Sequence, residues 1–130
     1  MKKILLTGSG PTSFIGRNLK ESLSIKYQLL APTSKELDLC NYEDVMKYNE
    51  KNDISIIIHS ATYSTRIKGS EQELESNLKM FYNLEKISKN TDKFIYFGSG
   101  AEFDKTLPIN MIKEEDFGRS IPKDSYGLAK

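Results

Sequence analysis

A tyrosine and a lysine stand four residues apart at the end of the chain, in residues 122–130 (PKDSYGLAK). On a helix this spacing puts Tyr126 and Lys130 on one face, so that the ammonium lies close to the phenol. The unperturbed pKa of a tyrosine is about 10, and a nearby cation stabilises the phenolate and moves that pKa toward a value useful for general acid-base catalysis. By itself, a Tyr-x-x-x-Lys spacing in a lysine-rich chain indicates a solvated helix face rather than a catalytic pair.

A second candidate for chemistry is the glycine-rich stretch at residues 7–16 (TGSGPTSFIG). It lies between an apolar run and an amphipathic segment, the context in which free backbone N–H groups and a helix dipole bind the pyrophosphate of a dinucleotide. The spacing is not G-x-G-x-x-G, because Ser13 stands where the third glycine belongs. It is not a P-loop either, since Arg17 and Asn18 follow Gly16. Alone, the loop favours nucleotide binding only modestly over a flexible turn.

Read together, both stretches resemble motifs of the extended short-chain dehydrogenase/reductase family, the NAD(P)-dependent epimerases and dehydratases. Residues 7–8 and 14–16 resemble the two halves of its opening motif, Thr-Gly-x-x-Gly-Phe-Ile-Gly, with a middle part that is two residues longer and Ser13 in place of a glycine. Residues 122–130 resemble its Pro-x-x-x-Tyr-Gly-x-Ser/Ala-Lys.

The resemblance continues through the segments between these two motifs. Residues 97–103 (FGSGAEF) resemble the family's Ser-Ser-x-x-Val-Tyr, with Ser99 on the second serine. Residues 38–39 match its Asp-Leu pair under the adenine, residues 59–62 (HSAT) its His-x-Ala-Ala segment along the cofactor, and Asn77 the first residue of its Asn-x-x-Gly helix. The departures around Ser99 are Gly98, Glu102, Phe103 and Asp104.

The resemblance implies a role for each matched residue. Tyr126 would exchange the proton at a sugar hydroxyl or ketone, Lys130 would tune it and hydrogen-bond the cofactor ribose, and Ser99 would orient the reacting oxygen, with hydride passing to or from the nicotinamide. The substrates implied are nucleotide-activated sugars. The predicted cofactor-binding residues are Gly8, Gly10, Ser13, Phe14, Ile15, Gly16, Ser34, Lys35, Asp38, Leu39, Ser60, Ala61, Asn77, Tyr126 and Lys130.

The choice between NAD and NADP depends on the end of the second strand. NAD-binding proteins usually carry an acidic residue there for the ribose hydroxyls. This chain has no acid in the region before Glu36, and Ser34 and Lys35 can instead meet a 2′-phosphate. We therefore favour NADP slightly, and NAD stays open.

Several matched residues also have a structural interpretation when each is taken alone. His59 fits a hydrogen-bonded core histidine, Asn77 a polar residue on a helix face, and Asp38 a turn residue before a helix cap at Asn41. The order and spacing of the whole set favour the functional interpretation.

The elements that would position these residues alternate between strands and helices. Continuous apolar runs at residues 4–6, 54–58 and 94–97, and a weaker one at 27–31, predict strands covered on both faces. Between them, three segments have helical periodicity. Their predicted inward residues are Phe14, Ile15, Leu19 and Leu23 in the first, Val45 and Tyr48 in the second, and Leu74, Leu78, Phe81 and Leu84 in the third, from about Gln72 to Ser88.

This alternation predicts an α/β fold, a Rossmann-like parallel sheet with helices on both faces, without the family's C-terminal strands and substrate lobe. We expect residues 1–130 to form one incomplete NAD(P)-binding domain that ends at the Tyr-x-x-x-Lys motif, with a long surface loop over 98–124 and a short helix from near Asp124. The chain would then be the cofactor-binding half of an enzyme. The alternative is a non-catalytic dinucleotide-binding or interaction module.

Composition limits the partners. Nineteen basic against eighteen acidic residues give a net charge of +1, which does not favour nucleic acid or an anionic membrane. No apolar run approaches the roughly 18 residues of a membrane span. The single cysteine, Cys40, which we expect to be a small buried or half-buried side chain, and the lack of a metal-ligand cluster fit a reducing cytoplasm. Full-length family members often dimerise, so a homodimer stays open.

Overall fold

A computed structural model describes residues 1–64 and 71–130 of the chain. Its parts divide into two compact units. Unit 1 consists of Met1–Thr62 and Lys79–Phe97, and unit 2 of Tyr63–Leu78 and Gly98–Lys130. One long helix, α3 (Glu71–Ser88), contributes to both units.

Unit 1 is built on a four-stranded parallel sheet with the order β2-β1-β3-β4. The strands are β1 (Lys3–Thr7), β2 (Gln28–Leu30), β3 (Ile56–His59) and β4 (Lys93–Tyr96). In this register Leu5 pairs with Ile57 and Thr7 with His59, so β1 and β3 end level with one another. All four apolar runs therefore form strands as predicted, and parallel pairing brings their carboxyl ends to one edge of the sheet.

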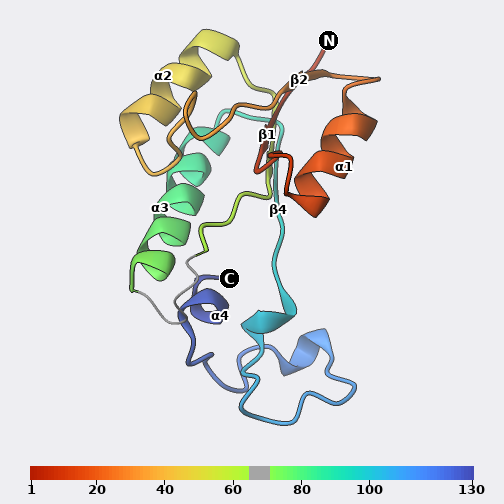
Figure 1. Cartoon of the computed structure of the whole chain (residues 1–130), viewed down its shortest axis with the longest axis vertical. Helices are drawn as coiled ribbons and strands as arrows, with labels where there is room; N and C mark the ends of the chain where they lie inside the picture. Colours follow the sequence, from red (N-terminus) through yellow and green to blue (C-terminus); the bar gives the residue numbers. More distant parts are fainter. Residues whose placement is uncertain (65–70) are drawn as a thin grey trace. The chain divides into compact units, whose positions relative to one another are not determined.

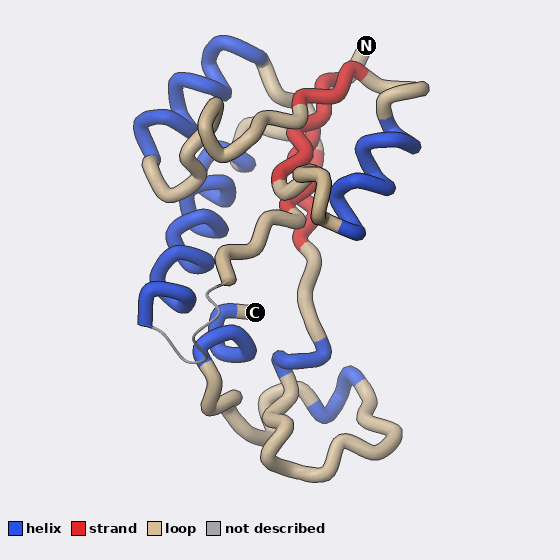
Figure 2. The backbone as a smooth tube through the Cα atoms, viewed as in Figure 1, coloured by secondary structure: helices blue, strands red, loops and turns tan. Residues whose placement is uncertain are grey.

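Helices cover both faces of this sheet (Figures 1 and 2), which confirms the predicted fold class. Alternate residues of β1 point to opposite faces. Leu5 belongs to a core cluster with Val45 of α2 (Tyr42–Asn52) and Leu84 of α3, whereas Leu6 belongs to a cluster on the other face against which Leu19 of α1 (Phe14–Leu23) packs. The strands are thus apolar throughout because each face has its own helical layer.

A local signal starts α2. Asn41 caps α2 as predicted, because its Oδ1 accepts the main-chain N–H groups of Glu43 and Asp44 at 3.0 and 3.4 Å. Val45 is buried and Tyr48 is half-buried against the core, also as predicted. Cys40 is half-buried, in agreement with the sequence-based expectation.

For two residues of α1, Phe14 and Ile15, the predicted inward orientation is wrong. The side chains of Phe14 and Ile15 are 77% and 44% exposed, while Leu19 and Leu23 pack on the sheet. Phe14 and Ile15 lie in the first turn, where Gly16 faces the glycine loop and not the sheet. Helical periodicity alone does not reveal that the buried residue of this turn is Gly16, packed against the loop.

The buried face of α3 is also rotated from the predicted one. Of the predicted stripe only Leu84 is buried, and the other three residues are half-buried. The buried positions repeat at helical spacing but include polar residues, which a search for apolar periodicity does not count. They are Glu73, Asn77, Met80, Asn83, Leu84 and Ile87.

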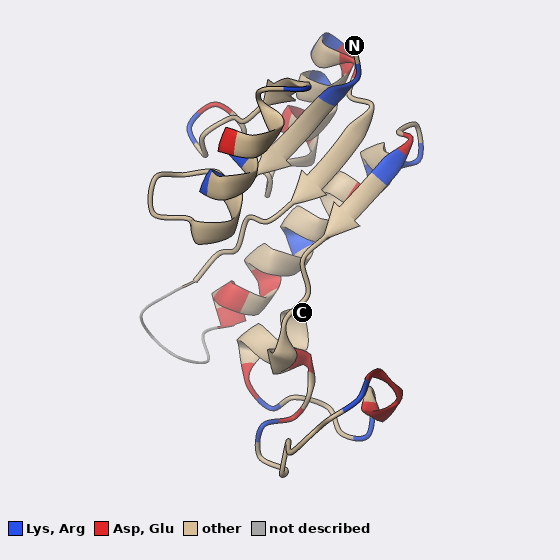
Figure 3. Cartoon of the chain, turned by 90° about the vertical axis from the view of Figure 1, so that its right-hand side faces the viewer, with Lys and Arg blue, Asp and Glu red and all other residues tan. Residues whose placement is uncertain are grey.

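Unit 2 consists of short turns and helices. Two 3-10 helices, η1 (Gly100–Glu102) and η2 (Glu114–Asp116), interrupt the predicted loop, and α4 (Ser125–Ala129) begins after Asp124, whose carboxylate accepts the Gly127 N–H at 2.8 Å. Acidic residues, coloured red on the ribbon of Figure 3, lie in the first turn of α3 and on η2, where their charge is favourable near the positive end of each helix. Within residues 1–64 and 71–130, no helix is long and apolar enough to cross a membrane.

The core of unit 1 gives a stability prediction. Ile57 is fully buried between β1 and the helices, so Ile57→Ala should lower the free energy of unfolding by about 2–5 kcal/mol. Ile25 is 82% exposed, so the control Ile25→Ala should change it by no more than about 0.5 kcal/mol. Urea unfolding of the two variants measures the difference, and equal losses would contradict this description of the core.

Candidate functional site

The glycine loop of unit 1 is defined by two close backbone approaches. Gly8 has φ +75° after β1, a conformation that favours glycine, and a Cβ there would lie 2.7 Å from the carbonyl carbon of Ser60. A Cβ at Gly16 would overlap the carbonyl oxygen of Gly8. Neither position has room for a side chain, so the loop, the start of α1 and the segment after β3 are packed main chain to main chain.

The other predicted loop residues differ in how far they are already engaged. Ser13 is the N-cap of α1, and its Oγ accepts the Gly16 N–H at 3.1 Å. A Cβ at Gly10 would meet no atom within 4 Å, so the loop is open to solvent at this point. The exposed side chains of Phe14 and Ile15 flank the cap. The loop therefore has the free space at Gly10 that a bound anion needs, while Ser13 already holds the helix start.

The segment after β3 is joined to the end of β1 by hydrogen bonds. Ser60 Oγ donates to the Thr7 carbonyl at 2.7 Å, and the Ala61 N–H donates to Thr7 Oγ1 at 3.3 Å. His59 is buried, with Nδ1 2.7 Å from the same hydroxyl and its ring stacked on Tyr96. The structure therefore brings the predicted Ser60 and Ala61 against Gly8, and it places His59 in the core.

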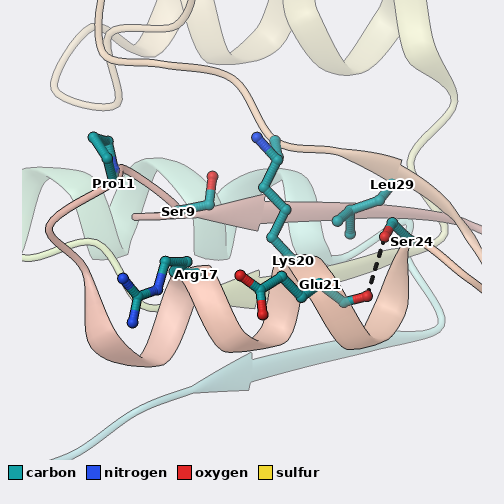
Figure 4. A pocket seen from close by; sticks show the side chains of 8 residues that line it. Ser9, Pro11, Arg17, Lys20, Glu21, Ser24 and Leu29 are labelled. Atoms are coloured by element: carbon teal, nitrogen blue, oxygen red, sulfur yellow. Dashed lines mark hydrogen bonds between the residues drawn. The ribbon is translucent and has the colours of Figure 1, made fainter.

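A pocket of about 500 Å³ lies beside the glycine loop, between α1 and β2 (Figure 4). Its basic side chains, Arg17 and Lys20, come from α1, and the carboxylate of Glu21 also lines it. The residues that complete the lining are Ser9, Pro11, Ser24, Leu29 and Ala31. Arg17 and Lys20 were not predicted as binding candidates, although both lie in the helix that directly follows the glycine loop.

The predicted residues after β2 lie on exposed turns. Ser34 and Lys35 are exposed, and Asp38 Oδ1 accepts the Cys40 N–H at 2.9 Å in a local turn. The carboxylate of Glu36 is engaged as well, because its Oε2 accepts the Thr33 N–H at 2.8 Å. Hydrogen bonds from Thr33 lower the pKa of this carboxyl. Leu39 is half-buried and packs against the core of unit 1.

Asn77 has a structural role within unit 2. Its Oδ1 accepts the Tyr63 N–H at 2.9 Å, and its Nδ2 donates to the carbonyls of Tyr63 and Glu73 at 2.8 and 2.7 Å. Asn77 is buried, so these bonds hold the main chain at Tyr63 against α3. If Asn77 also bound a cofactor, as predicted, it would have to do so through a side-chain amide that already makes three hydrogen bonds.

Unit 2 also holds the predicted Ser-Tyr-Lys residues. Lys130 is the C-cap of α4, and its Nζ lies 5.8 Å from the centre of the Tyr126 ring, so the ammonium lies near the tyrosine as the spacing predicts. Ser99 is the N-cap of η1, and its Oγ accepts the Ala101 N–H at 3.2 Å. A Cβ at Gly127 would overlap the Ala101 carbonyl oxygen, so α4 and η1 are packed as closely as two main chains allow.

The charge on Lys130 is influenced by two opposing effects. Its side chain is half-buried, and burial lowers the pKa of the ammonium below the usual value, while the negative charge of Glu102 raises it. The carboxylate of Glu102 is fixed because it accepts the Ser99 N–H at 2.8 Å. No group of three or more His, Cys, Asp and Glu side chains in the described residues has a metal-binding arrangement.

Asp104, another departure from the family pattern, closes the loop that follows η1. Its Oδ1 accepts from the Thr106 N–H and hydroxyl at 3.0 and 2.7 Å, and its Oδ2 accepts from the Ser120 hydroxyl at 2.7 Å. These hydrogen bonds, of which the one from the Thr106 hydroxyl has the largest effect, lower the pKa of the Asp104 carboxyl to about 2. Asp104 therefore ties residues 104–106 to the segment just before α4.

Comparison with known proteins agrees with this geometry. The sequence model of the NAD-dependent epimerase/dehydratase family matches residues 4–130. The chain belongs to this family. A curated member, GDP-L-colitose synthase of Yersinia pseudotuberculosis, is 33% identical over 98% of this chain and 44% of its own length.

Solved structures share the fold. A GDP-D-glycero-L-gluco-heptose synthase of Campylobacter jejuni, crystallised in the presence of NADPH, has a TM-score of 0.82 and 24% identity over 98% of this chain and 39% of its own. A GDP-mannoheptose C4 reductase of the same species, with NADP bound, has a TM-score of 0.79 and 23% identity over 98% and 42%. The chain thus spans less than half the length of these three relatives.

Asn77 gives a prediction that separates its structural role from cofactor binding. Asn77→Ala removes three hydrogen bonds to main chain and should lower the free energy of unfolding by about 1–3 kcal/mol. The control Asn18→Ala removes one exposed bond to Phe14 and should cost far less. Thermal unfolding and NADPH titration are measured on both. Unchanged stability with weakened NADPH binding in Asn77→Ala would show that the residue acts on the cofactor.

Proposed function

We propose that this chain provides the cofactor-binding loop and the proton-transfer residues of an NADPH-dependent enzyme that reduces a keto sugar linked to GDP. Family membership and the names of the relatives support this choice among epimerase, dehydratase and reductase. The curated relative is a GDP-sugar synthase, and the two solved relatives are a GDP-heptose synthase and a GDP-heptose C4 reductase.

The position of Lys130 Nζ, 5.8 Å from the centre of the Tyr126 ring, is the observation that carries the proposal. Bound NADPH would supply the hydride. As the hydride reaches the carbonyl carbon, Tyr126 donates its phenolic proton to the carbonyl oxygen, and the product is an alcohol. The ammonium of Lys130 stabilises the phenolate that remains, and the hydroxyl of Ser99 would orient the reacting oxygen.

The glycine loop fits the pyrophosphate of the cofactor. Gly10 leaves open space in front of the main chain, and the start of α1 presents the positive end of the helix dipole. Gly8 and Gly16 hold the loop at the carboxyl ends of the strands, the edge at which parallel sheets bind ligands.

The preference for NADP rests on the pocket between α1 and β2. Arg17 and Lys20 supply positive charge beside the loop, and the carboxylate of Glu36 is engaged with Thr33 and not free for ribose hydroxyls. Glu21 also lines the pocket and would favour an uncharged ribose, so the two cations are needed to offset it. Lys35, the lysine predicted from sequence, stays a second candidate for the 2′-phosphate.

Replacing the tyrosine tests the catalytic part of the proposal. In the full gene product, Tyr126→Phe should lower kcat for reduction of a GDP-linked keto sugar by about 10²- to 10⁴-fold, because the general acid is lost. NADPH binding, measured by fluorescence titration, should persist. The control Tyr82→Phe removes the hydroxyl of an exposed tyrosine on α3 and should keep wild-type turnover. Turnover that survives Tyr126→Phe would contradict the assignment, and NADPH binding without turnover in the unaltered protein would favour a non-catalytic module.

Replacing the two basic residues tests the cofactor preference. Arg17→Ala and Lys20→Ala should each weaken NADPH binding by roughly 10-fold or more, because a charge-assisted hydrogen bond to phosphate is lost, and should leave NADH binding nearly unchanged. The control is Lys47→Ala, since Lys47 is a highly exposed cation on α2. If Lys35→Ala reduces the NADPH preference and the two α1 variants do not, the 2′-phosphate is recognised after β2.

A further inference from the structure

Glu102 acts on two residues of unit 2, the main chain of Ser99 and the ammonium of Lys130. As the third residue after the cap of η1, it accepts the Ser99 N–H through Oε1 at 2.8 Å, and Ser99 in turn caps the 3-10 helix. This reciprocal arrangement fixes both the backbone at Ser99 and the position of the carboxylate. Glu102 therefore acts on Ser99 through the main chain.

The carboxylate of Glu102 occupies the space that a side chain at position 98 would need. A Cβ built on Gly98 would overlap Glu102 Oε1 and would lie 3.3 Å from the carboxyl carbon. The obstacle is the end of a flexible side chain, so a residue larger than glycine would displace the carboxylate from the Ser99 N–H and would not break the main chain. Gly98 and Glu102 are thus sterically complementary.

The same carboxylate acts on Lys130. Close packing of Gly127 against the Ala101 carbonyl brings α4 against η1, and Glu102 raises the pKa of the Lys130 ammonium, which burial lowers. Among the titratable groups near Lys130 are Glu102 on η1 and Tyr126 on α4. One side chain therefore contacts the main chain of Ser99 and influences the charge of Lys130.

We propose that Glu102 is a positioning residue that sets the main chain of Ser99, and that the lack of a side chain at Gly98 makes this placement of Glu102 possible. The proposal rests on the proposed function of Ser99, Tyr126 and Lys130. The resembled family pattern has serine and valine where this chain has Gly98 and Glu102. The geometry joins these two departures into one arrangement, because a serine at 98 and this placement of a glutamate at 102 exclude each other.

Four variants of the full gene product separate the parts of the proposal. Glu102→Ala removes both interactions, and Gly98→Ala displaces the carboxylate while it keeps the charge. Each should lower kcat by roughly 10- to 100-fold through misplacement of Ser99. The double variant Gly98→Ala/Glu102→Ala should lose no more than Glu102→Ala alone, since the added methyl group then meets an empty space. Glu102→Gln keeps an oxygen acceptor for Ser99 and removes only the charge.

Controls come from the same short helix and from an exposed carboxylate. A Cβ at Gly100 would meet no atom within 4 Å, so Gly100→Ala should keep wild-type kcat. Glu115→Gln alters a side chain that is 74% exposed on η2 and should behave likewise. Thermal unfolding of every variant verifies that losses of kcat occur in folded protein.

A second readout does not depend on turnover. Titration of Lys130 by NMR, with lysine labelled at Cε, should show a lower pKa in Glu102→Gln than in the unaltered protein, and no change in Glu115→Gln. Wild-type kcat in Glu102→Ala or multiplicative losses in the double variant would each overturn the proposal. An unchanged Lys130 titration in Glu102→Gln would contradict the influence of Glu102 on Lys130 and leave its action on Ser99. If Tyr126→Phe keeps its turnover while the Lys130 titration moves, the proposed function fails and the link between Glu102 and Lys130 stands.

Discussion

The main-chain contact among Gly8, Gly16 and the Ser60–Ala61 peptide is the constraint on which unit 1 depends. β1 and β3 end level with one another, and the chain must leave both strands and begin α1 within the same small volume. Side chains at either glycine would push these segments apart, so the glycines are needed for packing as much as for a ligand. The loop that could hold a phosphate is thus a consequence of how tightly the sheet and the first helix join.

Unit 2 uses the same device with different residues. Gly127 lets α4 approach the Ala101 carbonyl, and Asp124 caps α4 from within the same turn. A helix of five residues has little stability of its own, and here its cap and its packing on η1 compensate for its length. The face that carries Tyr126 and Lys130 is therefore held by tertiary contact.

The strands, the cap of α2 and the start of α4 could be predicted from sequence because their signals are local. Each signal lies within or directly beside the element that it specifies: the continuous apolar runs in the strands, Asn41 before α2 and Asp124 before α4. The buried face of α3 could not be predicted in the same way. Asn77 is buried because it binds the main chain at Tyr63, a partner fourteen positions away that no periodicity reveals. The basic pocket was missed for a similar reason, since Arg17 gains meaning only when β2 is known to lie beside α1.

Two serines show why site residues and structural residues are hard to separate by type. Ser13 and Ser99 both follow a strand, both were predicted to contact a ligand, and both cap the helix that follows. A short hydroxyl side chain at a helix start accepts an N–H whether or not a ligand is bound, and its own proton stays available for a second partner. Capping therefore does not argue against a catalytic role for Ser99. It fixes the oxygen, and the glutamate that completes the same cap holds the main-chain N–H of Ser99.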